Sequence, residues 1–170
     1  MAHSRQWFAV LGAYGCGLLL GLLAAEGLAH QLVAHPHQLP ALAIIQHNLL
    51  VLVIMFLGIL TVGAVTLLVL LINGVMLGAV VGAYAWRGKL TAVLLALAPH
   101  GMLEVSAFLL AAYGDLLLVP LFWKLLRTGG WRNWYGHSQV LWKALLFNGC
   151  AVALLVCAGL IEHTLFLTVS

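Results

Sequence analysis

The sequence predicts an all-α fold: a polytopic membrane helix bundle of about five transmembrane helices plus one interfacial helix. Of its 170 residues, 65% are hydrophobic and 6% are charged. Soluble domains average about 45–50% apolar and about 25% charged residues, so the charges are too few to cover a soluble globule. Uncharged runs long enough to cross the ~30 Å hydrocarbon layer recur along the chain. A soluble enzyme, a disordered chain and a nucleic-acid-binding domain are thereby excluded.

The expected elements make up one integral-membrane domain over residues 1–170. The first span is expected at about 7–29, directly after Arg5. It is longer than the apolar core of about 7–15 residues in a signal peptide, so we interpret it as a retained helix. The following stretch, 30–40, contains three histidines and two prolines and is expected to be a loop.

The next 46 residues, 41–86, carry no charge. As a single helix they would be about 69 Å long, over twice the hydrocarbon thickness. They are therefore expected to form a hairpin of two spans, at about 42–60 and 65–86. The turn is expected near 58–66, where two glycines and two threonines lie close together.

The fourth span is expected at about 90–113, interrupted by Pro99. Residues 114–143 are the most polar part of the chain. Within them, the segment at about 115–135 is expected to lie along the membrane interface, because its tryptophans and tyrosine suit the headgroup level. The fifth span is expected at about 144–167.

The distribution of Lys and Arg predicts the orientation of the chain. With the N-terminus inside, the inner side carries Arg5, Lys124, Arg127, Arg132 and Lys143, and the outer side carries Arg87 and Lys89. Five basic residues against two favour an N-terminus inside and a C-terminus outside. The net charge of +3 does not indicate nucleic acid as a partner, because the seven basic residues are spread along the chain.

Several polar side chains fall inside the expected spans. An ionised group near the bilayer centre costs about 2.5–3.5 kcal/mol on insertion scales, so such residues need a partner or a function. We predict that side chains from separate spans meet in one polar cluster toward one leaflet. Its expected members are His47, Asn48, Asn73, His100, Glu104 and Glu162.

His100 and Glu104 are four residues apart and therefore share one helix face. Pro99 removes a backbone donor and loosens the helix just before them. The pair has two interpretations: a buried hydrogen-bonded pair that fixes helix packing, or a site that handles a metal, a proton or a substrate. The glycines expected to allow close helix packing are Gly58, Gly74, Gly78 and Gly101.

Together these motifs resemble the stage II sporulation protein M family over roughly residues 42–164. The resemblance is carried by His47-Asn48, Gly58, Asn73-Gly74 with Gly78, Pro99-His100-Gly101 with Glu104, and Glu162 with Thr164. It implies a multi-span protein of the bacterial plasma membrane. The namesake of the family works with cell-wall hydrolases when the forespore is engulfed.

Three functions remain open from the sequence. The first is a non-enzymatic scaffold or assembly component of an envelope or transport complex, with the bilayer, further copies or another membrane protein as partners. The second is a small transporter or channel-like unit whose pathway passes His47, Asn73, His100 and Glu104. The third is an intramembrane metal enzyme, in which His47, His100, Glu104 and Glu162 would hold zinc or a similar divalent ion.

Overall fold

The computed structural model describes residues 2–28, 41–128 and 138–169, and all elements in these ranges are helical. The helices are α1 (Ala2–Leu28), α2 (Ala41–Phe56), the short 3₁₀ helix η1 (Leu57–Thr61), α3 (Ala64–Trp86), α4 (Leu90–Thr128) and α5 (Ser138–Val169). Five helical segments, α2 together with η1 counting as one, are long and apolar enough to cross a membrane. The predicted all-α membrane bundle is thereby confirmed.

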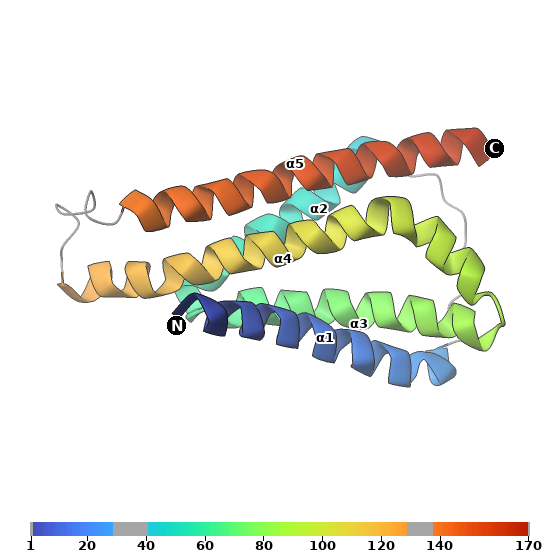
Figure 1. Cartoon of the computed structure of the whole chain (residues 1–170), viewed down its shortest axis with the longest axis horizontal. Helices are drawn as coiled ribbons and strands as arrows, with labels where there is room; N and C mark the ends of the chain where they lie inside the picture. Colours follow the sequence, from blue (N-terminus) through green and yellow to red (C-terminus); the bar gives the residue numbers. More distant parts are fainter. Residues whose placement is uncertain (1, 29–40, 129–137, 170) are drawn as a thin grey trace.

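The helices pack as two close pairs, α1 with α3 and α4 with α5 (Figure 1). Helix α2 contacts α3, α4 and α5 and so joins the two pairs. The start of α1, the α2–α3 turn and the end of α4 lie at one end of the bundle, and the α3–α4 turn lies at the other (Figure 1). Successive helices therefore run in opposite directions, as successive membrane crossings require.

Glycines bring the backbones of α1 and α3 into direct contact. A Cβ atom built on Gly21 would lie 2.7 Å from the backbone nitrogen of Ala79, and one built on Gly74 would lie 2.9 Å from that of Leu18. Such distances leave no room for a side chain, so the close approach depends on glycine. We call this contact the α1–α3 seam; its glycines are Gly17, Gly21, Gly74, Gly78 and Gly82.

The α2–α3 turn falls within the stretch 58–66. The backbone of Gly58 packs so closely on Thr66 that a Cβ atom would lie 2.7 Å from the Thr66 nitrogen. The buried Thr66 hydroxyl donates to the carbonyl of Met55 at 2.7 Å and ties α3 back to α2. The hydroxyl of Thr61 accepts a hydrogen bond from a backbone N–H in the first turn of α3 at 3.1 Å. Gly63 has a φ of 88°, a conformation that glycine adopts without strain.

Helix α4 differs from the expectation of a span that ends at residue 113 and a separate interfacial segment from 115. It continues without a break to Thr128, and Asp115 is completely buried inside it. The helix continues because residues 116–123 are apolar, and several of their side chains are buried in the bundle. The expected segment beyond residue 128 lies outside the described residues.

Two prolines lie inside α4, at positions 99 and 120. The helix bends in its first half, the yellow-green stretch of Figure 1, which contains Pro99. Pro120 has no N–H and leaves the carbonyl of Leu116 without its helical donor. The side-chain amide of Gln6, at the start of α1, donates to this carbonyl at 2.9 Å.

Candidate functional site

Glu104 lies in α4, shortly after the bend, and its carboxylate is bound by a side chain from another helix. The Nδ2 amide of Asn48 in α2 donates to Oε1 of Glu104 at 2.6 Å. Asn48 is only 8% exposed, whereas Glu104 is half-buried. The hydrogen bond joins residues 56 positions apart and holds α2 against α4.

Three further ionisable groups lie in the same region as this carboxylate. His100, His47 and Glu162 all lie within electrostatic range of Glu104. A protonated imidazole at position 100 or 47 attracts the carboxylate, and the carboxylate of Glu162 in α5 repels it. The Nδ1 atom of His100 is buried and has no hydrogen-bond partner among the described residues. These groups come from α2, α4 and α5, and the hydrogen bond to Glu104 that is found among the described residues is that of Asn48.

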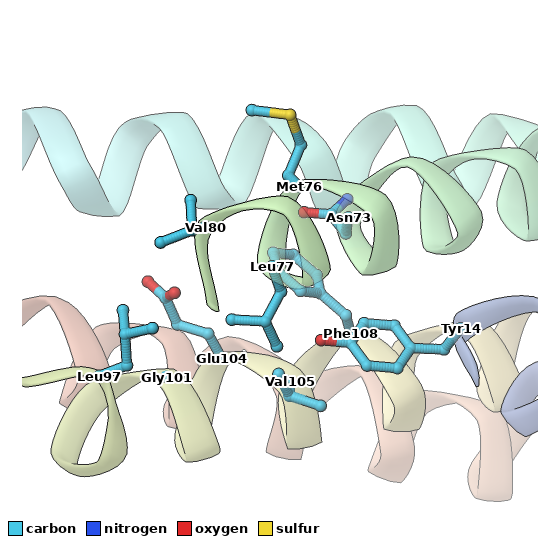
Figure 2. Close-up of a pocket in the computed structure, with 10 residues that line it drawn as sticks. All are labelled: Tyr14, Asn73, Met76, Leu77, Val80, Leu97, Gly101, Glu104, Val105 and Phe108. Carbon is cyan, nitrogen blue, oxygen red and sulfur yellow. The ribbon is translucent and has the colours of Figure 1, made fainter. Parts of the chain in front are cut away.

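Asn73 contributes to the same region without a hydrogen bond to Glu104. Its Nδ2 amide donates to the carbonyl of Val69 in its own helix at 2.9 Å. Asn73 and Glu104 face a common cavity of about 220 Å³ between α1, α3 and α4 (Figure 2). The cavity is lined by Tyr14, Asn73, Met76, Leu77, Val80, Leu97, Gly101, Glu104, Val105 and Phe108.

The cavity continues as an open groove along α3 and α4. A second cavity of about 460 Å³ shares Leu77, Leu97, Gly101 and Val105 with the first and extends toward the α3–α4 turn. We call the two together the α3–α4 groove. It exists because α4 bends near Pro99 and packs against α3 much less than against α5.

The four predicted packing glycines divide into two groups. Gly58, Gly74 and Gly78 contact the backbone or side chains of a neighbouring helix so closely that a Cβ atom does not fit. At Gly101 the described residues show no close approach, because among them a Cβ atom there would meet only Leu97 of its own helix, at 3.7 Å. Gly101 instead lines the open α3–α4 groove.

The zinc hypothesis receives no geometric support. In the part of the chain that the structure describes, no three His, Cys, Asp or Glu side chains come together in a way that could hold a metal ion. His47, His100 and Glu162 lie within electrostatic range of Glu104, but among the described residues the four do not form a ligand shell.

A second intramembrane polar pair was missed by the sequence reasoning. Oδ1 of the buried Asp115 accepts a hydrogen bond of 3.3 Å from Nδ2 of Asn148 in α5. Its other oxygen, Oδ2, is buried without a partner among the described residues. Gly114 lets α5 come close, since a Cβ atom there would lie 2.6 Å from Asn148 Nδ2. The available signal was spacing: Asp115 follows Glu104 by 11 residues, which is three helical turns on one face.

Comparison with known proteins agrees with this architecture. No curated protein and no solved structure matches the chain. The model of the family described as stage II sporulation protein M matches residues 8–165, which is nearly the whole chain. This protein therefore belongs to the stage II sporulation protein M family.

Proposed function

We propose that this protein is a non-enzymatic scaffold or assembly component of an envelope or transport complex. It acts in the bacterial plasma membrane, with its N-terminus inside and its C-terminus outside. The observation that carries the proposal is the use of intramembrane polar groups as links between helices. These links are Asn48–Glu104, Asn148–Asp115, Gln6 to the Leu116 carbonyl, and Trp123 to the Ile59 carbonyl.

Such interhelical hydrogen bonds are typical of a rigid helix bundle. Interhelical hydrogen bonds and small residues are the main means by which helices associate in lipid, where the hydrophobic effect between them is absent. The α1–α3 seam adds backbone contact along several turns of both helices. The sequence also contains no nucleophile elbow, no H-E-x-x-H pair and no phosphate-binding loop. A scaffold role, in which the bundle is a rigid surface for the assembly of partner proteins, accounts for these features.

The proposal is tested on the full chain in its native membrane. We expect a tagged chain to migrate on native gels as part of an assembly larger than the chain alone. His100→Ala should lower the recovery of this assembly or the yield of folded protein, because it removes a buried group next to Glu104. Normal assembly of His100→Ala, accompanied by loss of a chemical activity, contradicts a scaffold role.

The cavity beside Glu104 favours one alternative, a small transporter or channel-like unit. A bent helix with polar groups at mid-depth is the arrangement that transporters use for their sites. The pathway would pass His47, Asn73, His100 and Glu104. Purified protein in vesicles would then carry protons or small ions, detected with an internal dye, and Glu104→Gln would stop the flux. The absence of flux for the folded wild-type chain excludes this alternative.

A further inference from the structure

The α3–α4 groove presents hydrogen-bond acceptors for which the chain supplies few donors. Among the described residues, Asn48 is the donor to the Glu104 carboxylate, and it binds one oxygen, Oε1. Asn73 uses its amide N–H on Val69 of its own helix. The carbonyl oxygen of Asn73 and the second carboxylate oxygen of Glu104 therefore remain as acceptors on the groove wall (Figure 2).

The depth of these acceptors limits what can reach them. Asn73 is nine residues after the start of α3 and thirteen before its end. At 1.5 Å per residue it lies about 13 Å and about 20 Å along the helix from the two ends. A lipid headgroup stays near the interface, and acyl chains have no donors. A donor that another protein supplies at this depth must come on a segment that itself crosses the membrane.

The groove is open and lined mainly by apolar side chains, which suits contact with an apolar helix. Its described walls include exposed apolar side chains, such as Met76 at 62% and Met102 at 70% exposed. Gly101 has no side chain, and among the described residues a Cβ atom there would meet only Leu97 of its own helix, so the backbone of an incoming helix can approach. From Asn73 to Val81 the groove follows nine residues of α3, about 12 Å or two helical turns.

A second copy of this chain does not carry a Lys or Arg at the required depth. All seven Lys and Arg residues lie near the ends of helices or between them: Arg5, Arg87, Lys89, Lys124, Arg127, Arg132 and Lys143. None is placed to reach the depth of Asn73 from a second bundle in the same membrane. A Lys or Arg that pairs with Glu104 must therefore belong to a different chain.

The geometry points to a specific partner class: the α3–α4 groove binds a transmembrane helix of another protein that carries one Lys or Arg near mid-depth, which pairs with Glu104 and Asn73. This inference rests on the proposed assembly role and names the chemistry of the partner. The carboxylate and the cation neutralise each other in lipid, where either one alone is costly.

The test uses synthetic transmembrane helices and the full-length purified chain in phosphatidylcholine vesicles. The probe is a Leu/Ala helix of about 20 residues with one central Lys, and its matched control has Met at the same position. Energy transfer between labelled probe and labelled protein reports binding. We expect the Lys helix to bind about tenfold more tightly than the Met helix, equivalent to about 1.4 kcal/mol.

Variants identify the groove as the site. Glu104→Gln keeps an oxygen that accepts from Asn48 but removes the charge, and should abolish the preference for Lys. Glu26→Gln, at an exposed position near the end of α1, is the matched control and should preserve it. Gly101→Leu fills the groove and should weaken binding of both helices, and it serves as the second variant if Glu104→Gln does not fold.

Three results would overturn the inference: no Lys preference in folded wild-type protein, a preference that survives Glu104→Gln, or equal competition by hexylamine, which would make the groove a site for small amines. The outcome is separable from the assembly role. An intact complex on native gels without a Lys preference rejects the groove and retains the scaffold. A Lys preference in a chain that forms no complex in its host retains the groove as a helix-binding site and rejects the scaffold role.

Discussion

The side-chain amide of Gln6 donates, at 2.9 Å, to the one backbone carbonyl of α4 that Pro120 deprives of its helical donor, that of Leu116. The contact joins the first turns of α1 to the second half of α4, 110 residues away. Next to it, the rings of Trp7 and Tyr113 stack with centroids 4.3 Å apart. The hydrogen bond that Pro120 cannot donate within α4 is thus replaced by one from a side chain of α1.

We expect Gln6→Leu to destabilise the protein by about 0.5–1 kcal/mol, at the lower end of the range for a hydrogen bond. The loss is small because Gln6 Oε1 is itself buried without a partner among the described residues, and the substitution removes that unsatisfied atom too. In Pro120→Ala the new N–H supplies the Leu116 carbonyl, so Gln6→Leu should then cost much less. Unfolding of the four proteins in mixed micelles with increasing SDS measures this. If Gln6→Leu lowers the unfolding free energy equally in wild-type protein and in Pro120→Ala, Gln6 does not compensate for the missing Pro120 N–H.

The α1–α3 seam predicts a sharp difference between neighbouring glycines of α1. Gly17→Ala places a methyl group against the backbone of Leu71 and should cost about 1–3 kcal/mol, the usual cost of overpacking. Gly15→Ala is the matched control, since a Cβ atom there has nothing within 4 Å. Thermal unfolding in detergent, followed by tryptophan fluorescence, should show a lower Tm for Gly17→Ala alone. Similar Tm values for the two variants would rule out the seam.

The Asp115–Asn148 pair is expected to behave as a coupled unit. Asn148→Leu leaves a buried carboxyl group without its donor and should cost about 1–3 kcal/mol. Asp115→Leu introduced together with Asn148→Leu should recover most of this loss, because both polar groups are then gone. A double-mutant cycle of unfolding free energies measures the coupling. Strictly additive costs would show that the two side chains act independently.

The proposed orientation is tested with reporters at each end of the full chain. Green fluorescent protein fused before Met1 should fluoresce, because the N-terminus is expected inside, where five of the seven basic residues gather. Alkaline phosphatase fused after Ser170 should be active, because it folds only outside. Arg87→Glu combined with Lys89→Glu should leave this orientation unchanged. An active phosphatase at the N-terminus would reverse the assignment.

The number and the broad position of the helices could be predicted because both follow from composition and length. A run of 46 uncharged residues must fold back, and the glycines and threonines near 58–66 indicated where. The end of the fourth span could not be predicted. Asp115 looked like the start of an interfacial segment, because a charge usually marks the end of a span. Only the packing of α5, through Gly114 and Asn148, makes its burial possible.

The candidate site was predictable in the same partial way. Spacing placed His100 and Glu104 on one face, and the cost of charge in lipid singled out the residues around them. The individual partners were not accessible from spacing. That Asn48 binds Glu104 while Asn73 turns to its own helix depends on how α2 and α3 are rotated, which a nearly uniform apolar surface does not reveal. The position of Tyr14 in the cavity could not be predicted, since nothing in the sequence relates α1 to α3 and α4.

The pairing of α1 with α3 has a consequence for the biosynthesis and membrane insertion of the protein. During synthesis the first helix enters the membrane well before the third leaves the ribosome, and among the described helices of the folded chain α1 does not pack on α2. Gly17 and Gly21 therefore lack their packing partner in α3, and face lipid or the insertion machinery, until some fifty further residues have been translated. A chaperone that shields a small-residue helix face, or a pause in translation before α3, would act on this interval.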